Sequence, residues 1–370
     1  MVSESVKLLL TGDVMTGRGI DQILPHPSDP VLYEDYVKSA LDYVKLAEDA
    51  HGPIPRRVPY EYIWGDALDE LKARNLDFRL INLETAITSD GIPEPKGINY
   101  RMHPANIGVL TAARIDACVL ANNHMLDWGV SGLNETLETL ERAGIAAVGA
   151  GRNQRDATAP LVRQLADNRR IVVFAYGSTD SGVPYYWAAG ENAPGVNVLS
   201  GFSDRTATDI ADRIQAIKRS GDVVIVSIHW GSNWGYEIPA AHRRFAHTLI
   251  ETGVVDVIHG HSSHHARVCE VWRGKLIMYG CGDLINDYEG ISGYEVYRDD
   301  LGLMYFPEID PTNGQLIALE MAPFRIRRFR LECAPDHDVT WLAETLWREG
   351  RQVGTGVEVT NTGHLRLTWK

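Results

Sequence analysis

The sequence predicts an α/β protein, and two features of the chain support this fold class. Several short β-branched runs each end in a polar cluster, and helical patterns lie between these runs. Continuous apolar runs are typical of strands buried on both faces of a sheet, and alternation with helices is typical of α/β architectures. The 370 residues, of which 44% are hydrophobic and 23% charged, suffice for a large globular core.

Five of the predicted strands end at a side chain that can bind a ligand. The runs are VKLLLTGD ending at Asp13, DFRLINLE at Glu84, DACVLANNH at His124, DVVIVSIHWG at His229 and VVDVIHGH at His261. Ligands collect beyond strand ends in sheets of this kind. We therefore expect these side chains to share one cleft.

Helical periodicity predicts the elements between and after these strands. Residues 203–219 carry isoleucines on one stripe, with Ser203 as the expected N-cap. Leucines at 133, 137 and 140 repeat this arrangement before Gly144. A further helix is expected at 338–349, followed by two short strands.

We expect a single domain over residues 1–370 with two additions. Residues 25–65 are rich in Pro, Tyr and acidic groups, which predicts a partly helical, lid-like insertion beside the site. From about residue 300 the chain predicts a β-rich extension, with one hairpin connection at Pro311 and Gly314. The run FRIRRFR at 324–330 predicts one half-buried strand whose arginines face water.

Composition excludes several classes of protein. A net charge of −13 without a basic cluster argues against nucleic-acid binding. No apolar stretch reaches 18 residues, and no export signal precedes the first predicted strand, so we expect a cytoplasmic protein without a membrane span. The cysteines lack metal or disulfide spacing and are expected to be core thiols in a reducing compartment: Cys118, Cys269, Cys281 and Cys333.

Seven of the thirteen histidines lie between residues 229 and 265. His242 and His247 belong to a predicted amphipathic helix, where we expect surface or capping roles. Four other histidines stand at or just beyond strand ends, beside small residues. This placement suits imidazole ligands of a metal, and the four are His229, His259, His261 and His264.

The stretch LLLTGDVMTGRG at 8–19 allows a phosphate cradle, a metal site or a tight turn. A P-loop requires Lys and Ser or Thr after its last glycine, whereas Arg18 and Gly19 follow here. Asp13 therefore fits a metal ligand better. Several carboxylates and imidazoles in one cleft need divalent cations to balance them, and mixed Asp, Glu, His and Asn ligands suit one or two ions of Mn, Fe, Zn or Ca.

The ordered motifs GDVM, INLE, ANNHMLDWG, HWGSNWGYE and GHSSHH resemble the CapA-like family, named for poly-γ-glutamate capsule synthesis. This family is a branch of the calcineurin-like metallophosphoesterases, and the match runs from about residue 6 to 290. The resemblance implies a four-layer αββα sandwich of mixed sheets. It implies that His124 is the general acid/base and that Asp13 and His259 are also catalytic. Alternatively, His259 lies behind the metal ligands and supports them. The implied metal ligands are Asp13, Glu84, Asn123, His229, His261 and His264.

Two positions depart from ordinary phosphoesterases of this superfamily. Met15 replaces the histidine of the first Asp-x-His motif, and Asn82 with Glu84 replaces the bridging aspartate of the second. These changes argue against generic phosphatase activity. CapA-like proteins of the capsule type are also generally membrane-anchored, whereas no anchor is expected here.

Aromatic loops beside the proposed ligands predict a peptide-like substrate. The expected substrate-binding residues are Arg18, Asn82, Trp128, Tyr185, Tyr186, Trp230 and Trp234. We expect a divalent-metal-dependent enzyme acting on a carboxylate-bearing peptide or polyglutamate-like partner. Its chemistry would be epimerisation at a C-terminal residue of a ribosomal peptide, as in some unanchored CapA-like proteins, or γ-glutamyl processing. The alternatives are a metal-dependent phosphoesterase and a non-catalytic accessory protein of polyglutamate synthesis.

Overall fold

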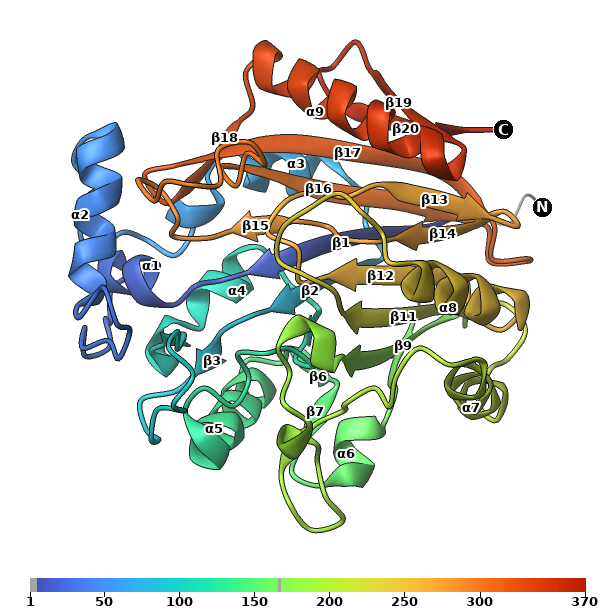
Figure 1. Ribbon diagram of the computed structural model, residues 1–370, viewed down its shortest axis with the longest axis horizontal. Helices are drawn as coiled ribbons and strands as arrows, with labels where there is room; N and C mark the ends of the chain where they lie inside the picture. Colours follow the sequence, from blue (N-terminus) through green and yellow to red (C-terminus); the bar gives the residue numbers. More distant parts are fainter. Residues whose placement is uncertain (1–4, 166–167) are drawn as a thin grey trace.

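The computed structural model describes residues 5–165 and 168–370, and its largest element is a ten-stranded mixed sheet (Figure 1). Its strands are β1 (Val6–Val14), β2 (Phe78–Leu83), β5 (Ala117–Val119), β6 (Ala146–Val148), β15 (Asp283–Ile285), β16 (Leu301–Ile309), β17 (Leu316–Arg327), β18 (Arg330–Cys333), β19 (Thr355–Val359) and β20 (Leu365–Trp369). The order is β19-β20-β17-β16-β1-β2-β5-β6, with β15 beside β1 and β18 beside β17. Strands β15, β1, β2, β5 and β6 pair in parallel, and the C-terminal strands add antiparallel pairs.

A six-stranded mixed sheet packs against the first. Its strands are β8 (Leu161–Gln164), β9 (Arg170–Gly177), β11 (Val223–His229), β12 (Val257–His261), β13 (Cys269–Trp272) and β14 (Lys275–Met278). They lie in the order β13-β14-β12-β11-β9-β8, and the four inner strands are parallel. Two small sheets complete the pairing, β3 (Ala86–Ile87) with β4 (Arg101–Met102) and β7 (Ala150–Gly151) with β10 (Gly195–Val196). The predicted α/β class with mixed sheets is confirmed.

Alternating strand residues assign the two faces of each sheet. Leu8 and Leu10 of β1 join Ile225 of β11 in one apolar cluster between the sheets, whereas Leu9 joins a cluster with helices α1 to α5. Helices α7 and α8 cover the outer face of the six-stranded sheet, and α9 packs beside the C-terminal strands. The helices are α1 (Arg18–Ile23), α2 (Ala40–His51), α3 (Ala67–Ala73), α4 (Gly108–Ala112), α5 (Gly129–Arg142), α6 (Gln154–Thr158), α7 (Asp204–Gln215), α8 (Ala240–Glu251) and α9 (Asp336–Gly350).

Most predicted elements are confirmed. The five runs that end at candidate ligands contain β1, β2, β5, β11 and β12, although β5 ends at Val119 and His124 lies in the turn beyond it. Helices α5, α7 and α9 lie where periodicity predicted them. The Ser203 side chain accepts a hydrogen bond from the Thr206 backbone N–H, as expected of an N-cap. Helix α7 ends at Gln215, four residues earlier than predicted. Residues 310–315 connect β16 to β17 as a hairpin.

The prediction of one strand over 324–330 is wrong. Strand β17 ends at Arg327, and Arg328 and Phe329 turn the chain with φ of 56° and 55° into β18. The Glu289 carboxylate accepts hydrogen bonds at 2.6 Å from both turn N–H groups, and the Phe329 ring is buried. This tertiary contact stabilises a turn that strand periodicity does not reveal.

The insertion at 25–65 is partly helical, as predicted, because it contains α2 and a 3₁₀ turn at Tyr62–Trp64. The expectation of core thiols holds for three cysteines but is wrong for Cys333, whose position at the end of β18 leaves it exposed. No helix in the described ranges is both long and apolar enough to cross a membrane.

Candidate metal site

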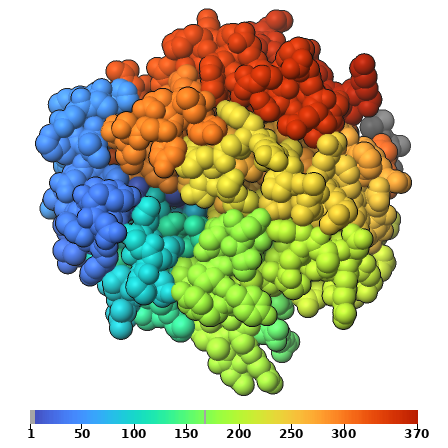
Figure 2. Space-filling model, viewed as in Figure 1, coloured from blue at the N-terminus to red at the C-terminus, as the bar shows by residue number. Residues whose placement is uncertain are grey.

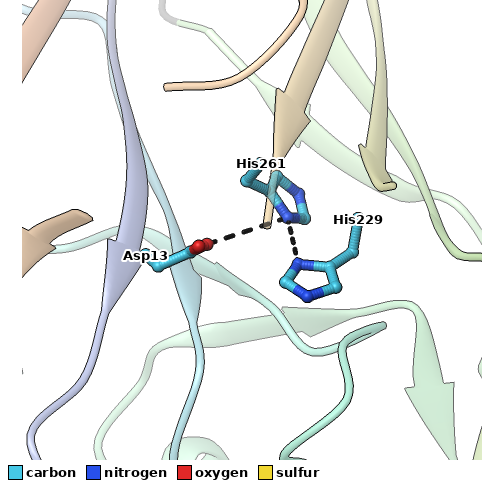
Figure 3. Close-up of side chains that lie close together, drawn as sticks. All are labelled: Asp13, His229 and His261. Atoms are coloured by element: carbon cyan, nitrogen blue, oxygen red, sulfur yellow. Dashed lines mark hydrogen bonds and ion pairs between the residues drawn. The ribbon is translucent and has the colours of Figure 1, made fainter. Parts of the chain in front are cut away.

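Strand ends from both sheets bring carboxylates and imidazoles together. Asp13 lies beside Asn82 on one side and Asp283 on the other, and His229 lies beside His261. Parallel strands present their carboxyl ends at the same edge, which explains this convergence. Figure 3 shows Asp13, His229 and His261 pointing toward one another.

Two groups of buried side chains have donor atoms that lie within 4.8 Å of one another. The first group is Asp13, His229 and His261, in which the two histidine Nδ1 atoms are 2.8 Å apart. The second group is Asp13, His264 and Asp283, in which His264 Nδ1 is 2.9 Å from Asp283 Oδ1. Since both groups contain Asp13, they fit a centre of two neighbouring cations.

Glu84 and Asn123 adjoin the first group. The Glu84 Oε1 atom is 3.9 Å from His229 Nε2, and its Oε2 atom is buried without a hydrogen-bond partner. Asn123 Oδ1 lies 3.0 Å from the same His229 Nε2. A buried carboxylate oxygen without a donor is costly, and a cation would satisfy it.

The pKa values of the carboxyl groups indicate a shortage of positive charge. Burial, with repulsion from Asp283, raises the pKa of Asp13 to about 7. Burial and the adjacent Asp13 raise the pKa of Glu84 well above its usual range. A divalent cation would stabilise both carboxylates in their charged form.

The imidazoles are held mainly in the neutral form that binds metals. Burial lowers the pKa of His229 and of His261 well below the ordinary value, with repulsion from nearby histidines adding to the effect. His264 differs, because Asp283 outweighs the effect of burial and raises its pKa. The donor set therefore fits a divalent metal ion in both charge and ligand type.

His259 and Asn82 lie behind the donor atoms. Both His259 ring nitrogens are engaged, Nδ1 at 3.0 Å from Ser227 Oγ and Nε2 at 2.7 Å from Thr11 O. Ser227 Oγ in turn lies 2.9 Å from His261 Nε2. The Asn82 amide donates to Asp13 Oδ1 at 2.7 Å. These contacts orient His261 and Asp13 rather than reaching the cleft.

His124 forms a buried acid/base pair beside the donor groups. Its Nδ1 is 2.6 Å from Asp127 Oδ2, and its Nε2 faces Glu84 Oε1 at 3.7 Å. Lys96 Nζ pairs with the other Asp127 oxygen at 2.7 Å. Burial lowers the pKa of His124 to about 4, despite the opposing effect of Asp127. A neutral imidazole with an oriented ring can accept a proton at Nε2.

A cavity of about 140 Å³ adjoins the candidate metal site at His264. Its walls are mostly aromatic and include Trp234, whose ring centroid is 5.4 Å from that of His264, and tyrosines of the 25–65 insertion. Arg18 closes one wall, with its guanidinium bonded to Asp287 at 2.5 and 3.1 Å and to Glu34 at 3.0 Å. Its charge is therefore neutralised within the protein.

The remaining predicted substrate residues lie in different environments. Trp230 is buried, and its indole donates to Tyr279 O at 3.0 Å behind β12. Trp128 is also buried and donates to Tyr100 O at 3.2 Å. Tyr185 and Tyr186 are exposed on a 3₁₀ turn.

His242 and His247 lie on α8 as predicted, but the surface position expected for His242 is wrong. Its ring is buried, stacks on Trp230 at 4.8 Å and lies 2.6 Å from Asp180 Oδ2. His247 Nε2 lies 2.9 Å from Glu270 Oε2.

Sequence reasoning missed four residues of the site: Lys96, Asp127, Ser227 and Asp283. Asp283 follows a glycine at the end of GCGD, as Asp13 does in TGD, so this repeated Gly-Asp pair could have revealed it. Lys96 lies in a loop, and nothing in its sequence neighbourhood indicates that it contacts Asp127.

Similarity to known proteins assigns the chain to a family. Residues 7–288 match the family model for the bacterial capsule synthesis protein PGA_cap, so the chain belongs to that family. A Mycobacterium tuberculosis protein named as a probable polyglutamine synthesis accessory protein is 48% identical over 95% of this chain and 93% of its own length. The capsule biosynthesis protein CapA of Bacillus anthracis is 24% identical over 88% of this chain and 68% of its own. The PGA biosynthesis protein CapA of Bacillus subtilis is 28% identical over 57% and 52%.

Proposed function

We propose that this chain is an accessory protein in the synthesis of a glutamate or glutamine polymer, and that it engages the polymer at a divalent-metal centre. Membership of the capsule synthesis family, with near full-length similarity to a probable polyglutamine synthesis accessory protein, supports the accessory role. The two donor groups that share Asp13 support the metal centre.

One or two ions of Mn, Fe, Zn or Ca would be held by Asp13, Glu84, Asn123, His229, His261, His264 and Asp283. Such an ion, when bound, acts as a Lewis acid toward a carboxylate or carbonyl oxygen. The chain's own residues orient this site, because Asn82 fixes Asp13 and Ser227 fixes His261.

The test is polymer production in cells. Deletion of the gene should lower the amount of glutamate or glutamine polymer, and the wild-type gene should restore it. An unchanged amount of polymer in the deletion strain would contradict the accessory role. Complementation with the Asp13→Ala/His261→Ala double variant tests whether polymer production depends on the metal centre. We expect this variant not to restore the polymer.

A second candidate function is catalysis on a peptide-like, carboxylate-bearing substrate, by epimerisation or γ-glutamyl processing. The buried His124–Asp127 pair beside the donor groups favours it, because this pair can move a proton. Incubation with peptide oligomers in heavy water separates the two reactions. Epimerisation replaces the hydrogen at one Cα with a deuterium from the solvent, whereas hydrolysis shortens the chain.

A phosphoesterase is the third candidate, and Met15 argues against it. The Met15 side chain is buried, and its sulfur accepts a hydrogen bond from Tyr288 at 3.8 Å, so this position supplies no imidazole. Release of phosphate from generic phosphoesters with added Mn²⁺ would favour this candidate over the other two.

We also propose that the fold is a four-layer αββα sandwich of the metallophosphoesterase type. The apolar cluster shared by both sheets and the helices over their outer faces support it.

Residues 25–65 would act as a lid, because Tyr36 and Tyr43 line the cavity beside His264. Four unpaired cysteines support a cytoplasmic location.

A further inference from the structure

Two of the exposed tyrosines of this protein line the cavity beside His264, and the others lie on loops that contact the neighbourhood of the candidate site. Of its 15 tyrosines, five are exposed: Tyr33, Tyr36, Tyr185, Tyr186 and Tyr294, at 53%, 70%, 71%, 73% and 38%. We name these five residues the tyrosine rim. Exposed aromatic rings that gather on one face are typical of binding surfaces.

Contacts connect one part of the rim to the candidate metal site. Tyr36 and Tyr294 line the same cavity as His264. The Tyr33 ring meets the Trp128 ring edge-on, with centroids 6.2 Å apart. Trp128 directly follows Asp127, the partner of His124.

Tyr185 and Tyr186 connect to the same site through another loop. The Tyr186 hydroxyl donates to the Glu94 carboxylate, and the Glu94 backbone N–H donates to Asp127 O at 2.8 Å. Figure 2 shows the segments that carry the rim, coloured blue, green and orange, on one face of the molecule, with cyan and yellow segments between them. These contacts place the loop of Tyr185 and Tyr186 beside the His124–Asp127 pair.

One cation at the rim is available for an acidic ligand. The Arg101 guanidinium lies 3.9 Å above the Trp128 ring and donates to the carbonyl of Asp29 at 3.0 Å. No carboxylate of the described residues lies within ion-pair distance of it. Arg18 and Lys96, by contrast, are paired with Asp287 and Asp127. Arg101 therefore gives the rim charge complementarity to a carboxylate.

We propose that the tyrosine rim binds an extended glutamyl chain, with one residue in the cavity beside His264 and the neighbouring residues on the rim. A cavity of about 140 Å³ accommodates one residue-sized group, whereas Tyr33, Tyr185 and Tyr186 of the rim do not line it. Tyrosine rings pack against methylene groups, and their hydroxyls donate to carboxylates and peptide carbonyls. This inference rests on the proposed function and adds the surface on which several residues of the polymer bind outside the cavity.

Calorimetric titration of the metal-loaded protein tests the proposal. The ligands are glutamate and the dimer, tetramer and octamer of γ-linked glutamate, with glutamine oligomers of equal length in parallel. Affinity should rise with length by roughly tenfold between dimer and octamer. The Tyr185→Ser/Tyr186→Ser variant should lose this gain and bind the dimer as wild type does. Arg101→Gln should abolish the preference for glutamyl over glutaminyl chains.

Trp347→Ser is the matched control, because Trp347 is an aromatic side chain 51% exposed on α9, remote from the rim in sequence. It should bind every oligomer as wild type does, and thermal unfolding should show all variants folded. Affinity that does not depend on length, or a rim variant that keeps the full gain, would overturn the rim proposal alone. If no oligomer of either kind binds wild type, the proposed function itself is contradicted.

Discussion

Asp13 is the residue on which the candidate metal site depends most, because both donor groups contain it. Its Oδ1 atom accepts from the Asn82 amide at 2.7 Å, and its Oδ2 atom accepts from the Ser262 N–H at 3.2 Å. Ser262 has a φ of 102°, an uncommon value for a residue with a side chain. The carboxylate is thus oriented by the protein before an ion binds.

We predict that Asp13→Asn abolishes metal binding. The amide cannot supply a negative charge to either donor group, so metal content measured by elemental analysis should fall from one or two equivalents to near zero. Asp256→Asn is the matched control. Asp256 is also buried, but it directly precedes β12, at the opposite end of the strand from His261. It pairs with Lys275 at 2.6 Å, away from the donor groups. It should lower the melting temperature and keep the metal; equal metal content in both variants would contradict the assignment.

At the scale of elements, close contact between β1 and β15 brings together two residues of the second donor group. A Cβ atom on Gly12 would lie 1.7 Å from Gly282 O, so only glycine allows the strands to approach. This approach places Asp13 beside Asp283.

Gly12→Ala should therefore separate the strands. We expect a loss of about 3 kcal/mol in the free energy of unfolding, measured in urea, together with weaker metal binding. Gly190→Ala is the comparison, because its nearest neighbour would be the Ala193 Cβ at 3.3 Å. If both substitutions cost the same, close strand approach is not the cause.

The C-terminal hairpin is attached to α3 through His364. Its Nε2 lies 2.9 Å from Glu70 Oε1 and its Nδ1 lies 2.8 Å from Glu320 Oε1. The hydrogen bond with Glu70, followed by the one with Glu320, raises the pKa of His364 despite partial burial.

This raised pKa predicts a pH-dependent contribution to stability. A histidine whose pKa is higher in the folded state stabilises the protein below its unfolded pKa of about 6.5, and the contribution is lost as pH rises through the folded pKa. His364→Gln should thus lower the melting temperature more near pH 6 than near pH 9, as measured by differential scanning calorimetry. His337→Gln, at a side chain 72% exposed, serves as the control. An equal effect of His364→Gln at both pH values would contradict the ion-pair account.

At the scale of the whole molecule, the first donor group joins the two sheets. Asp13 belongs to the ten-stranded sheet, whereas His229 and His261 belong to the six-stranded sheet. A bound ion would therefore connect both sheets and stabilise the entire fold.

Removal of metal by a chelator should lower the melting temperature, and Mn²⁺, Zn²⁺ or Ca²⁺ should restore it. An ion at a hundred times its Kd contributes about 2.7 kcal/mol. Metal affinity should fall as the pH is lowered, because protons then compete with the metal for the carboxylates and imidazoles. Thermal scans with and without chelator measure this effect. An identical melting temperature in all samples would mean that no ion joins the sheets.

The sequence by itself determined the α/β class, the main parallel strands, several of the helices, and the candidate ligands at strand ends, such as Asp13 and His261. These features depend on local periodicity and on the rule that parallel strands present their carboxyl ends together. The tertiary structure alone decided which side chains meet. It paired Arg18 with Asp287, Lys96 with Asp127 and Asp13 with Asp283. It also turned the chain at Arg328 and Phe329, where Glu289 accepts both N–H groups. The physical reason is that these contacts join residues that are distant in the chain. How close such residues come in space, and how deeply they are buried, depends on tertiary packing and not on a local sequence pattern.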